Sequence, residues 1–282
     1  MNRRSFMQML GLTSALPLVA GFSVKPESSE PSIIELVDSG ALGVPKLFPA
    51  QRFILKMMYG LELDARERQY LVRLERTGRC TPARQGSQEA VLIVGRRGGM
   101  SWLGQTVQLY ETLKLLRTQG SEPRGVISVS HDRASAGVHL DVYAACLAES
   151  HLQPYLKNRT ASYLNFEGEG GGRVRAMFKS AQGKDLRGLR ASSVVLDNAA
   201  YFQDLPLIHS IVAPCGGRIT ITTTSDGSKT FRDFYRQAKQ RGALTLRIPT
   251  QDANPTIPSD FYSRERDHLG LRSFGLEYEA RV

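Results

Sequence analysis

The segment at residues 91–103 constrains the fold of this chain more than any other. It reads Val-Leu-Ile-Val-Gly-Arg-Arg-Gly-Gly-Met-Ser-Trp-Leu, an apolar run followed by a loop rich in glycine and arginine and then by the start of an apolar helix. The apolar run predicts a buried strand, and small residues before a helix let backbone amides close around an anion. The segment therefore predicts a phosphate-binding P-loop. Its nucleotide-binding residues are expected to be Gly95, Arg96, Arg97, Gly98, Gly99, Met100 and Ser101.

One position of this loop departs from the pattern of an active nucleotide site. A working P-loop carries lysine immediately before the Ser/Thr, because its ammonium group reaches the β- and γ-phosphates. Here that position is Met100, which carries no charge. Arg96 and Arg97 are the candidates to compensate, since a guanidinium can bind phosphate from a different backbone position.

A second apolar strand, within residues 191–202, supplies the acidic half of such a site. It ends at Asp197, whose carboxylate can hold Mg²⁺ together with the Ser101 hydroxyl if the two project from adjacent strand ends. In ATPases of this kind the next residue is usually glutamate, which orients the attacking water. Here it is Asn198, an amide that can position water but cannot accept its proton.

The order of these motifs along the chain resembles the ATPase domain of the large terminase subunit, the DNA-packaging motor of tailed bacteriophages. The loop at residues 95–101 and the run at 185–201 carry the resemblance, which covers roughly residues 45 to 282. Three further segments match in the same order: residues 47–51 are similar to the adenine-reading segment, 219–225 to the coupling motif, and 254–258 with 274–278 to the segment that closes the domain.

The resemblance implies roles for single side chains. Gln51 would read an adenine edge, which its amide can do by donating and accepting together, although a glutamine at a helix start can equally be an exposed residue. Arg187 would be an arginine finger for a neighbouring subunit's γ-phosphate, or else a surface residue paired with Asp185. Asn198 would stand in the catalytic position. The coupling residues, which sense the γ-phosphate, would be Thr222, Thr223, Thr224 and Ser225.

The resemblance also implies ligands and partners. It implies ATP and Mg²⁺ as cofactors, double-stranded DNA as substrate, a homo-oligomeric ring, and the portal and small terminase subunit as partners. The missing lysine and glutamate predict weak or absent hydrolysis, because each lost transition-state contact commonly costs about 10²-fold in turnover. Two functions stay open: a packaging ATPase, and a catalytically silent module that holds nucleotide, DNA or active subunits.

The N-terminus allows two interpretations. Residues 1–45 are expected to form a basic arm or leader plus a linker, and residues 46–282 the ATPase domain, without the family's nuclease domain. Arg3-Arg4 and the apolar run to Phe22 resemble a twin-arginine export signal, which would make the P-loop vestigial. The alternative is a basic amphipathic arm, and we favour it together with a cytoplasmic location, because an ATP-driven motor needs ATP.

The alternation of strand and helix patterns predicts an α/β fold of the P-loop NTPase (RecA/ASCE-like) class, with a mainly parallel sheet between helices. Glycines at residues 167–173 predict a hairpin turn between two strands, and Arg173, Arg175 and Lys179 beside it are candidates to meet DNA. His139 and His151 fall on a predicted helix at residues 134–152. They lack metal-site spacing, so they are expected to be solvated or packed.

Composition adds the expected partner and compartment. The formal net charge is +10 and the pI about 9.7, which is typical of proteins that work against phosphate backbones. Cys80, Cys146 and Cys215 show neither paired nor metal-type spacing, which favours a reduced compartment.

Overall fold

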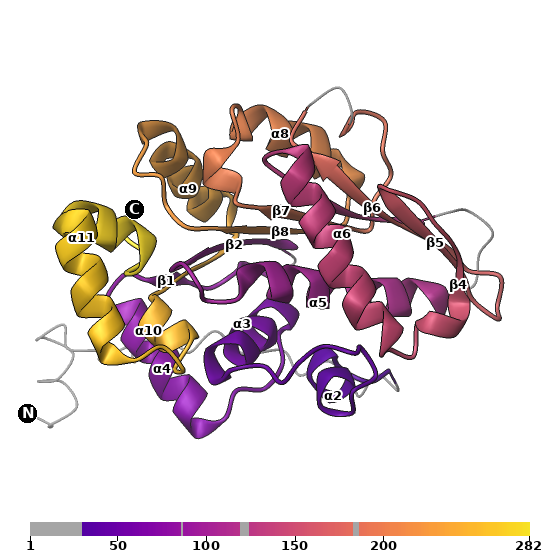
Figure 1. Cartoon of the computed structure of the whole chain (residues 1–282), viewed down its shortest axis with the longest axis horizontal. Helices are drawn as coiled ribbons and strands as arrows, with labels where there is room; N and C mark the ends of the chain where they lie inside the picture. The colour runs from indigo at the N-terminus through magenta and orange to yellow at the C-terminus, as the bar shows by residue number, and fades with distance from the viewer. Residues whose placement is uncertain (1–29, 86, 119–123, 183–185) are drawn as a thin grey trace, which may run out of the picture. The chain divides into compact units, whose positions relative to one another are not determined.

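The structure is a computed structural model that describes residues 30–282 except 86, 119–123 and 183–185 (Figure 1). The chain divides into a unit at Met1–Pro31 and a unit at Ser32–Val282, and the description below concerns the second. The arginine pair at Arg3 and Arg4 and the acidic residue Asp185 lie outside the described residues.

A nine-stranded sheet forms the centre of the second unit. The six strands from β9 to β6 run parallel, while β1 at one edge and β5 and β4 at the other pair antiparallel. This confirms the predicted α/β class with a mainly parallel sheet. In sheet order the strands are β1 (Cys80–Thr81), β9 (Leu244–Ile248), β2 (Glu89–Val94), β8 (Arg218–Thr223), β7 (Ser193–Asp197), β3 (Arg124–Ser130), β6 (Arg173–Ser180), β5 (Tyr163–Glu167) and β4 (Leu156–Arg159).

Helices cover both faces of the sheet (Figure 1). The α-helices are α2 (Ile33–Asp38), α3 (Pro49–Tyr59), α4 (Ala65–Arg76), α5 (Met100–Leu116), α6 (Arg133–Ala148), α8 (Leu205–Val212), α9 (Lys229–Arg241), α10 (Thr250–Ala253) and α11 (Ser259–Glu277). Short 3₁₀ turns occur at η1 (Gln153–Tyr155), η2 (Ala199–Tyr201) and η3 (Ala213–Cys215).

Strand β2 shows why two helical layers are needed. Its side chains alternate: Leu92 and Val94 join the core beneath α2, α3, α5 and α6, and Val91 and Ile93 join the core beneath α8 and α9. Successive strand residues point to opposite faces, so a strand that is apolar at every position must be covered on both sides. The run in the sequence that predicted a buried strand therefore also fixes the two-sided architecture.

Local sequence signals set the ends of the helices around the site. Pro49 occupies the first turn of α3 and Gly60, at φ 65°, ends it, the usual asymmetry of proline at the start and glycine at the end. Asp132 caps α6 by accepting from Ser135 N at 2.7 Å, the usual role of an aspartate that directly precedes a helix.

The N-terminal third differs from the prediction at residues 33–38, which form helix α2 instead of linker. Ser32 and Glu35 make a reciprocal capping box, and Ile33 is fully buried. Farther along, the two-residue strand β1 extends the sheet by pairing with β9. Both elements are short, so their periodicity carries little signal, and tertiary packing decides their conformation.

The predicted hairpin is confirmed, whereas one predicted adjacency is not. β5 and β6 pair antiparallel on either side of the glycine turn. Strands β2 and β7, which precede the P-loop and end at Asp197, were expected to be neighbours, but β8 lies between them. Strand order is a long-range property, and nothing local in either strand specifies it.

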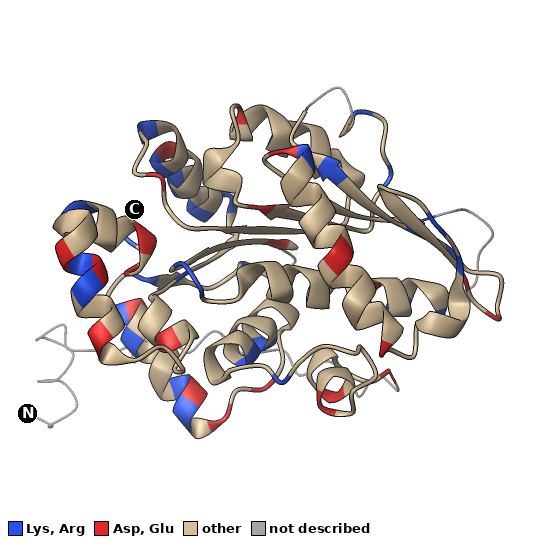
Figure 2. Cartoon of the chain, viewed as in Figure 1, with Lys and Arg blue, Asp and Glu red and all other residues tan. Residues whose placement is uncertain are grey.

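Charged residues are frequent on the outer helices α4, α9 and α11, while the central strands are largely uncharged (Figure 2). Over the described ranges, no helix combines the length and apolar character needed to span a bilayer.

Candidate nucleotide site

The loop between β2 and α5 has the backbone of an anion-binding turn. Arg97 and Gly99 adopt left-handed conformations, with φ of 65° and 79°. The first hydrogen bond of α5 runs from Leu103 N to Gly99 O at 3.0 Å, so the amides that precede Leu103 have no acceptor within the helix. They lie at a helix N-terminus that follows a buried parallel strand, the usual place for phosphate in α/β proteins.

Met100 occupies the position where an active loop carries its cation. The side chain is half-buried and packs against the apolar core that α3 and α5 share. It therefore contributes to packing at the start of α5 and supplies no charge to the loop. Trp102, the single tryptophan of the chain, follows Ser101 and is 39% exposed.

The two arginines of the loop contact the C-terminal helix. Arg96 Nε lies 3.0 Å from Glu277 Oε2, and Arg96 N donates to Glu277 O at 2.6 Å. The Arg97 guanidinium lies 4.8 Å from the ring centroid of Phe261, a cation–π distance. Both side chains thus have protein partners, and their expected compensation for the missing lysine would require these contacts to break.

The loop is also closely packed from behind by residues of α10 and the segment after α11. A Cβ added at Gly95 would lie 2.2 Å from Thr250 Oγ1 and 2.5 Å from Tyr278 O, so only glycine fits there. Thr250 Oγ1 also donates to Arg96 O at 2.8 Å. The C-terminal segment therefore fixes the path of the loop.

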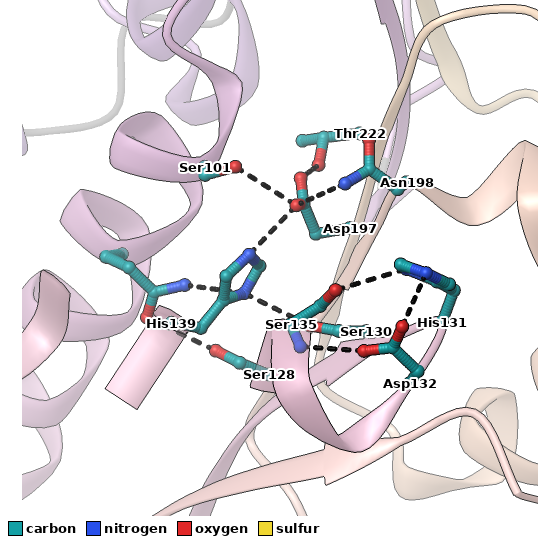
Figure 3. A network of polar contacts seen from close by, with 11 residues as sticks. Ser101, Ser128, Ser130, His131, Asp132, Ser135, His139, Asp197, Asn198 and Thr222 are labelled. Atoms are coloured by element: carbon teal, nitrogen blue, oxygen red, sulfur yellow. Dashed lines mark hydrogen bonds and ion pairs between the residues drawn. The ribbon is translucent and has the colours of Figure 1, made fainter. Parts of the chain in front are cut away.

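Asp197 forms the opposite wall of the site and is 2% exposed. Its Oδ2 accepts from Ser101 Oγ at 3.1 Å and from Asn198 Nδ2 at 3.2 Å, and its Oδ1 accepts from Thr222 Oγ1 at 2.5 Å. Figure 3 shows these side chains converging on the carboxylate. The predicted meeting of Ser101 and Asp197 is therefore present, although β8 separates their strands.

His139 also faces Asp197, and sequence reasoning did not place it there. Its Nε2 lies 2.9 Å from Asp197 Oδ2, and the side chain is 4% exposed (Figure 3). His139 is packed, which was one of the two predicted states, but its contact with Asp197 was not predicted. One signal was available: His139 lies on the same face of α6 as Ala136, Leu140 and Tyr143, all buried, and a polar side chain on such a face needs a buried partner.

A second layer of polar side chains holds the imidazole. His139 Nδ1 lies 3.3 Å from Gln105 Nε2 and 3.4 Å from Ser130 Oγ. Gln105 Oε1 in turn accepts from Ser128 Oγ at 3.4 Å. The two serines lie on β3 and Gln105 on α5, and all three are buried, so His139 is fixed from its far side.

Comparison with proteins of known structure places this geometry in a known fold. The Thermus phage P74-26 large terminase ATPase domain aligns over 80% of this chain and 96% of that domain, with a TM-score of 0.52 and 16% sequence identity. The HK97 bacteriophage large terminase aligns over 84% of this chain and 50% of that one, with a TM-score of 0.58 and 15% identity. The chain has the fold of a large-terminase ATPase domain.

A third structure contains a nucleotide. The large terminase from a thermophilic bacteriophage, in complex with ADP, aligns over 70% of this chain and 50% of its own, with a TM-score of 0.54 and 12% identity. This chain thus spans about half the length of the HK97 large terminase and of the ADP-bound one. No family model and no curated protein matches the sequence, so the likeness rests on the fold alone.

Within this terminase-type fold, the predicted coupling residues link β8 to the acidic strand. Thr222 contacts Asp197 as described, Thr223 Oγ1 accepts from Ala200 N at 3.1 Å, and Thr224 Oγ1 lies 3.0 Å from Tyr201 Oη. Burial raises the pKa of Tyr201, so its hydroxyl stays neutral. Ser225 is buried and accepts from Gly227 N. These contacts join the end of β8 to Asp197 and to η2, and the coupling role itself stays a prediction.

Gln51 lies against the P-loop, but its amide is already engaged. Its Nε2 donates to Gly98 O at 3.1 Å and its Oε1 accepts from Phe48 N at 2.9 Å. At 6% exposure it is not the exposed helix-start residue that was the alternative. It braces α3 against the loop, so reading an adenine edge would require these bonds to open.

The two predicted catalytic residues, Asn198 and Arg187, differ in whether they lie at Asp197. Asn198 adopts a left-handed backbone at φ 56° and turns its amide to Asp197. Arg187 is exposed, beside the undescribed residues 183–185, so its pairing with Asp185 lies outside the described residues. A finger role toward a neighbouring subunit stays a prediction.

The residues at Asp197 do not suit a divalent cation as they are arranged. In the described part of the chain, no three His, Cys, Asp or Glu side chains group closely enough to ligate a metal ion. The four lone-pair sites of the carboxylate already face two hydroxyls, one amide and one imidazole. A cation ligated by Ser101 and Asp197 would first have to displace some of these contacts.

Proposed function

We propose that this chain is a terminase-like P-loop protein that binds ATP or ADP and hydrolyses ATP slowly or not at all. The observation that carries the proposal is Met100, which fills the cation's position and packs into the core. Without an ammonium at that position, the β- and γ-phosphates lose the contact that would stabilise charge in the transition state. The backbone amides at the start of α5 still favour an anion.

Two further features of the site support slow hydrolysis. Asn198 cannot accept a proton from the attacking water, and its amide is turned toward Asp197. Arg96 and Arg97 have partners in α11. The phosphate contacts that remain are the loop amides and Ser101, which suffice for binding but offer little that strengthens only in the transition state.

A phosphate-release assay tests this proposal. We expect the chain as written to release phosphate near background and the double variant Met100→Lys with Asn198→Glu to exceed it by about 10²-fold. Calorimetric titration with ADP should show saturable binding to both proteins. Equally brisk hydrolysis in both proteins would refute slow turnover, and no binding of ADP to the chain as written would refute the nucleotide site.

Double-stranded DNA is the proposed macromolecular ligand, supported by the net charge of +10. Arg173 and Arg175 are exposed on β6 next to the glycine turn, and Lys179 lies farther along the same face of this strand. We expect DNA affinity to fall steeply with salt, because phosphate contacts release counterions. Arg173→Gln with Arg175→Gln should flatten that dependence by about two phosphate contacts. Unchanged slopes would place DNA elsewhere.

A packaging motor is the second candidate, favoured by the contact of Ser101 with Asp197 and by the link from Asp197 to Thr222. In that function the chain would use ATP with Mg²⁺, assemble as a homo-oligomeric ring with the portal and small terminase subunit in the cytoplasm, and insert Arg187 into the neighbouring site. DNA-stimulated ATP hydrolysis by the chain as written would select the motor over the silent module.

A further inference from the structure

We propose that His139 takes the place of the divalent cation at Asp197, so that the loop binds the phosphates of its ligand without Mg²⁺. The proposal rests on the nucleotide-binding function proposed above and specifies its ligand as a metal-free nucleotide. It follows from the crowding of one carboxylate oxygen and from the way His139 is held.

The crowded oxygen is Asp197 Oδ2. Ser101, Asn198 and His139 all approach it within 3.2 Å. Magnesium binds carboxylate oxygens at about 2.1 Å and demands near-octahedral geometry. An oxygen with three polar neighbours already in place has no open direction for such an ion, and the other oxygen is occupied by Thr222.

His139 cannot simply turn aside to admit a cation. Its Nδ1 faces Gln105 and Ser130, and its side chain is 4% exposed. Rotation away from Asp197 would leave these buried polar groups unpaired, each at a cost of about 1–3 kcal/mol. The contact between His139 and Asp197 is thus part of the packed core and not a surface pair.

His139 also provides a polar partner for the buried carboxylate of Asp197. A carboxylate that is 2% exposed needs hydrogen-bond donors or a positive partner. The hydroxyls, the amide and the imidazole together provide them, so Asp197 is satisfied before any ligand arrives. A cation would gain little by entering, because it would replace contacts that already compensate the carboxylate.

Two substitutions at one position separate the role of the imidazole from its volume. In His139→Gln the side-chain amide can still reach toward Asp197, as Nε2 does. In His139→Asn the shorter amide can replace Nδ1 but not Nε2, so Asp197 Oδ2 keeps only Ser101 and Asn198 as neighbours and gains room for a cation. We measure ADP affinity by calorimetry in excess Mg²⁺ and in EDTA, with the fold of each variant checked by circular dichroism.

We expect Mg²⁺ to change the ADP affinity of the chain as written, and of His139→Gln, by less than about threefold. His139→Asn should gain about tenfold affinity on addition of Mg²⁺, equivalent to about 1.4 kcal/mol. A strong Mg²⁺ requirement in the chain as written would overturn the proposal, as would a His139→Asn protein that folds and stays indifferent to Mg²⁺.

A measurement without nucleotide keeps the proposal testable if the variant does not fold. In the ¹⁵N-histidine spectrum of the chain as written, added Mn²⁺ should leave the His139 ring signals sharp, with His209, which contacts Glu89 instead, as the internal reference. Selective broadening of His139 would place a cation at Asp197 and overturn the proposal. Failure of ADP to bind in both buffers would instead refute the nucleotide function, so the two failures are distinct.

Discussion

Two largely buried histidine–carboxylate contacts lie at opposite ends of the parallel strands, one where β2 starts and one where β7 ends. They differ in the other groups that contact each carboxylate. Glu89 opens β2 and lies 3.2 Å from His209 Nε2, while Arg241 Nη2 donates to the same carboxylate at 2.7 Å. Asp197 closes β7 and meets His139, hydroxyls and an amide. Glu89 thus has a permanent cation, and the described partners of Asp197 are an imidazole and neutral groups.

This difference distinguishes the structural contact at Glu89 from the candidate ligand site at Asp197. Ligands of parallel α/β sheets bind beyond the carboxyl ends of the strands, where Asp197 lies, and Glu89 lies at the opposite end. The Arg241 guanidinium beside Glu89 keeps its positive charge at any working pH, which suits a purely structural contact. Among its described contacts Asp197 has no such permanent cation, which leaves that carboxylate dependent on His139.

The largest expected effect is on stability when each histidine is removed. His139→Phe should lower the free energy of unfolding by about 3–5 kcal/mol, because it leaves a buried carboxylate without its main partner. His209→Phe, the matched change at the other end, should cost about 1 kcal/mol, since Arg241 still pairs with Glu89. Urea unfolding measures both, and equal losses would erase the distinction between the two ends.

The second-largest effect on stability should come from loss of the Thr222 hydroxyl. Thr222→Val removes a hydrogen bond to a buried carboxylate, so we expect a loss of about 2 kcal/mol in urea unfolding. Thr220, two residues earlier on the same face of β8, has a buried hydroxyl without a hydrogen-bond partner among the described residues. Thr220→Val is therefore the control and should be neutral or slightly stabilising. A comparable loss in both would assign the effect to the strand and not to Asp197.

Removal of the cation at Glu89 should be milder. Arg241→Met is expected to cost about 1 kcal/mol, because the guanidinium is partly exposed and His209 remains. Arg236, on the same helix, pairs with Asp233 in a more exposed position, and Arg236→Met should change stability by less than about 0.5 kcal/mol. A larger effect at Arg236 than at Arg241 would contradict the structural role of the Glu89 pair.

The smallest effect is the pH dependence of stability that Glu89 contributes. Burial alone would raise the pKa of Glu89, but contacts with His209 and Arg241 outweigh it and lower the pKa below its ordinary 4.5. Ionised Glu89 therefore stabilises the fold above pH 4.5, and this contribution is lost as the pH falls through the lowered pKa. The stability gap between the chain as written and Glu89→Gln should close on acidification. If this stability gap widened on acidification, the predicted contribution of ionised Glu89 would be wrong in sign.

Much of the fold followed from local sequence patterns. The apolar run before Gly95, the glycine turn of the hairpin and the capping Asp132 each carry their signal within a few residues. The meeting of Ser101 with Asp197 followed from family order, because neither residue specifies the other locally.

The parts that escaped prediction depend on long-range packing. Strand β8 enters between two strands that precede it in the sequence, and no pattern in those strands encodes that order. His139 meets Asp197 only once α6 has packed against β3 and β6, and the hydrogen bond from Gln51 to Gly98 depends on how α3 packs against the loop. Side-chain pairing across elements is decided by three-dimensional register, which one sequence does not display.

Trp102 gives the loop a built-in optical reporter. It is the sole indole of the chain, it follows Ser101 directly, and part of its surface meets solvent. Its emission should therefore respond to any occupant of the anion pocket without a dye or a label. Ligand binding at the loop thereby becomes an event that a stopped-flow fluorimeter can time in the unmodified protein.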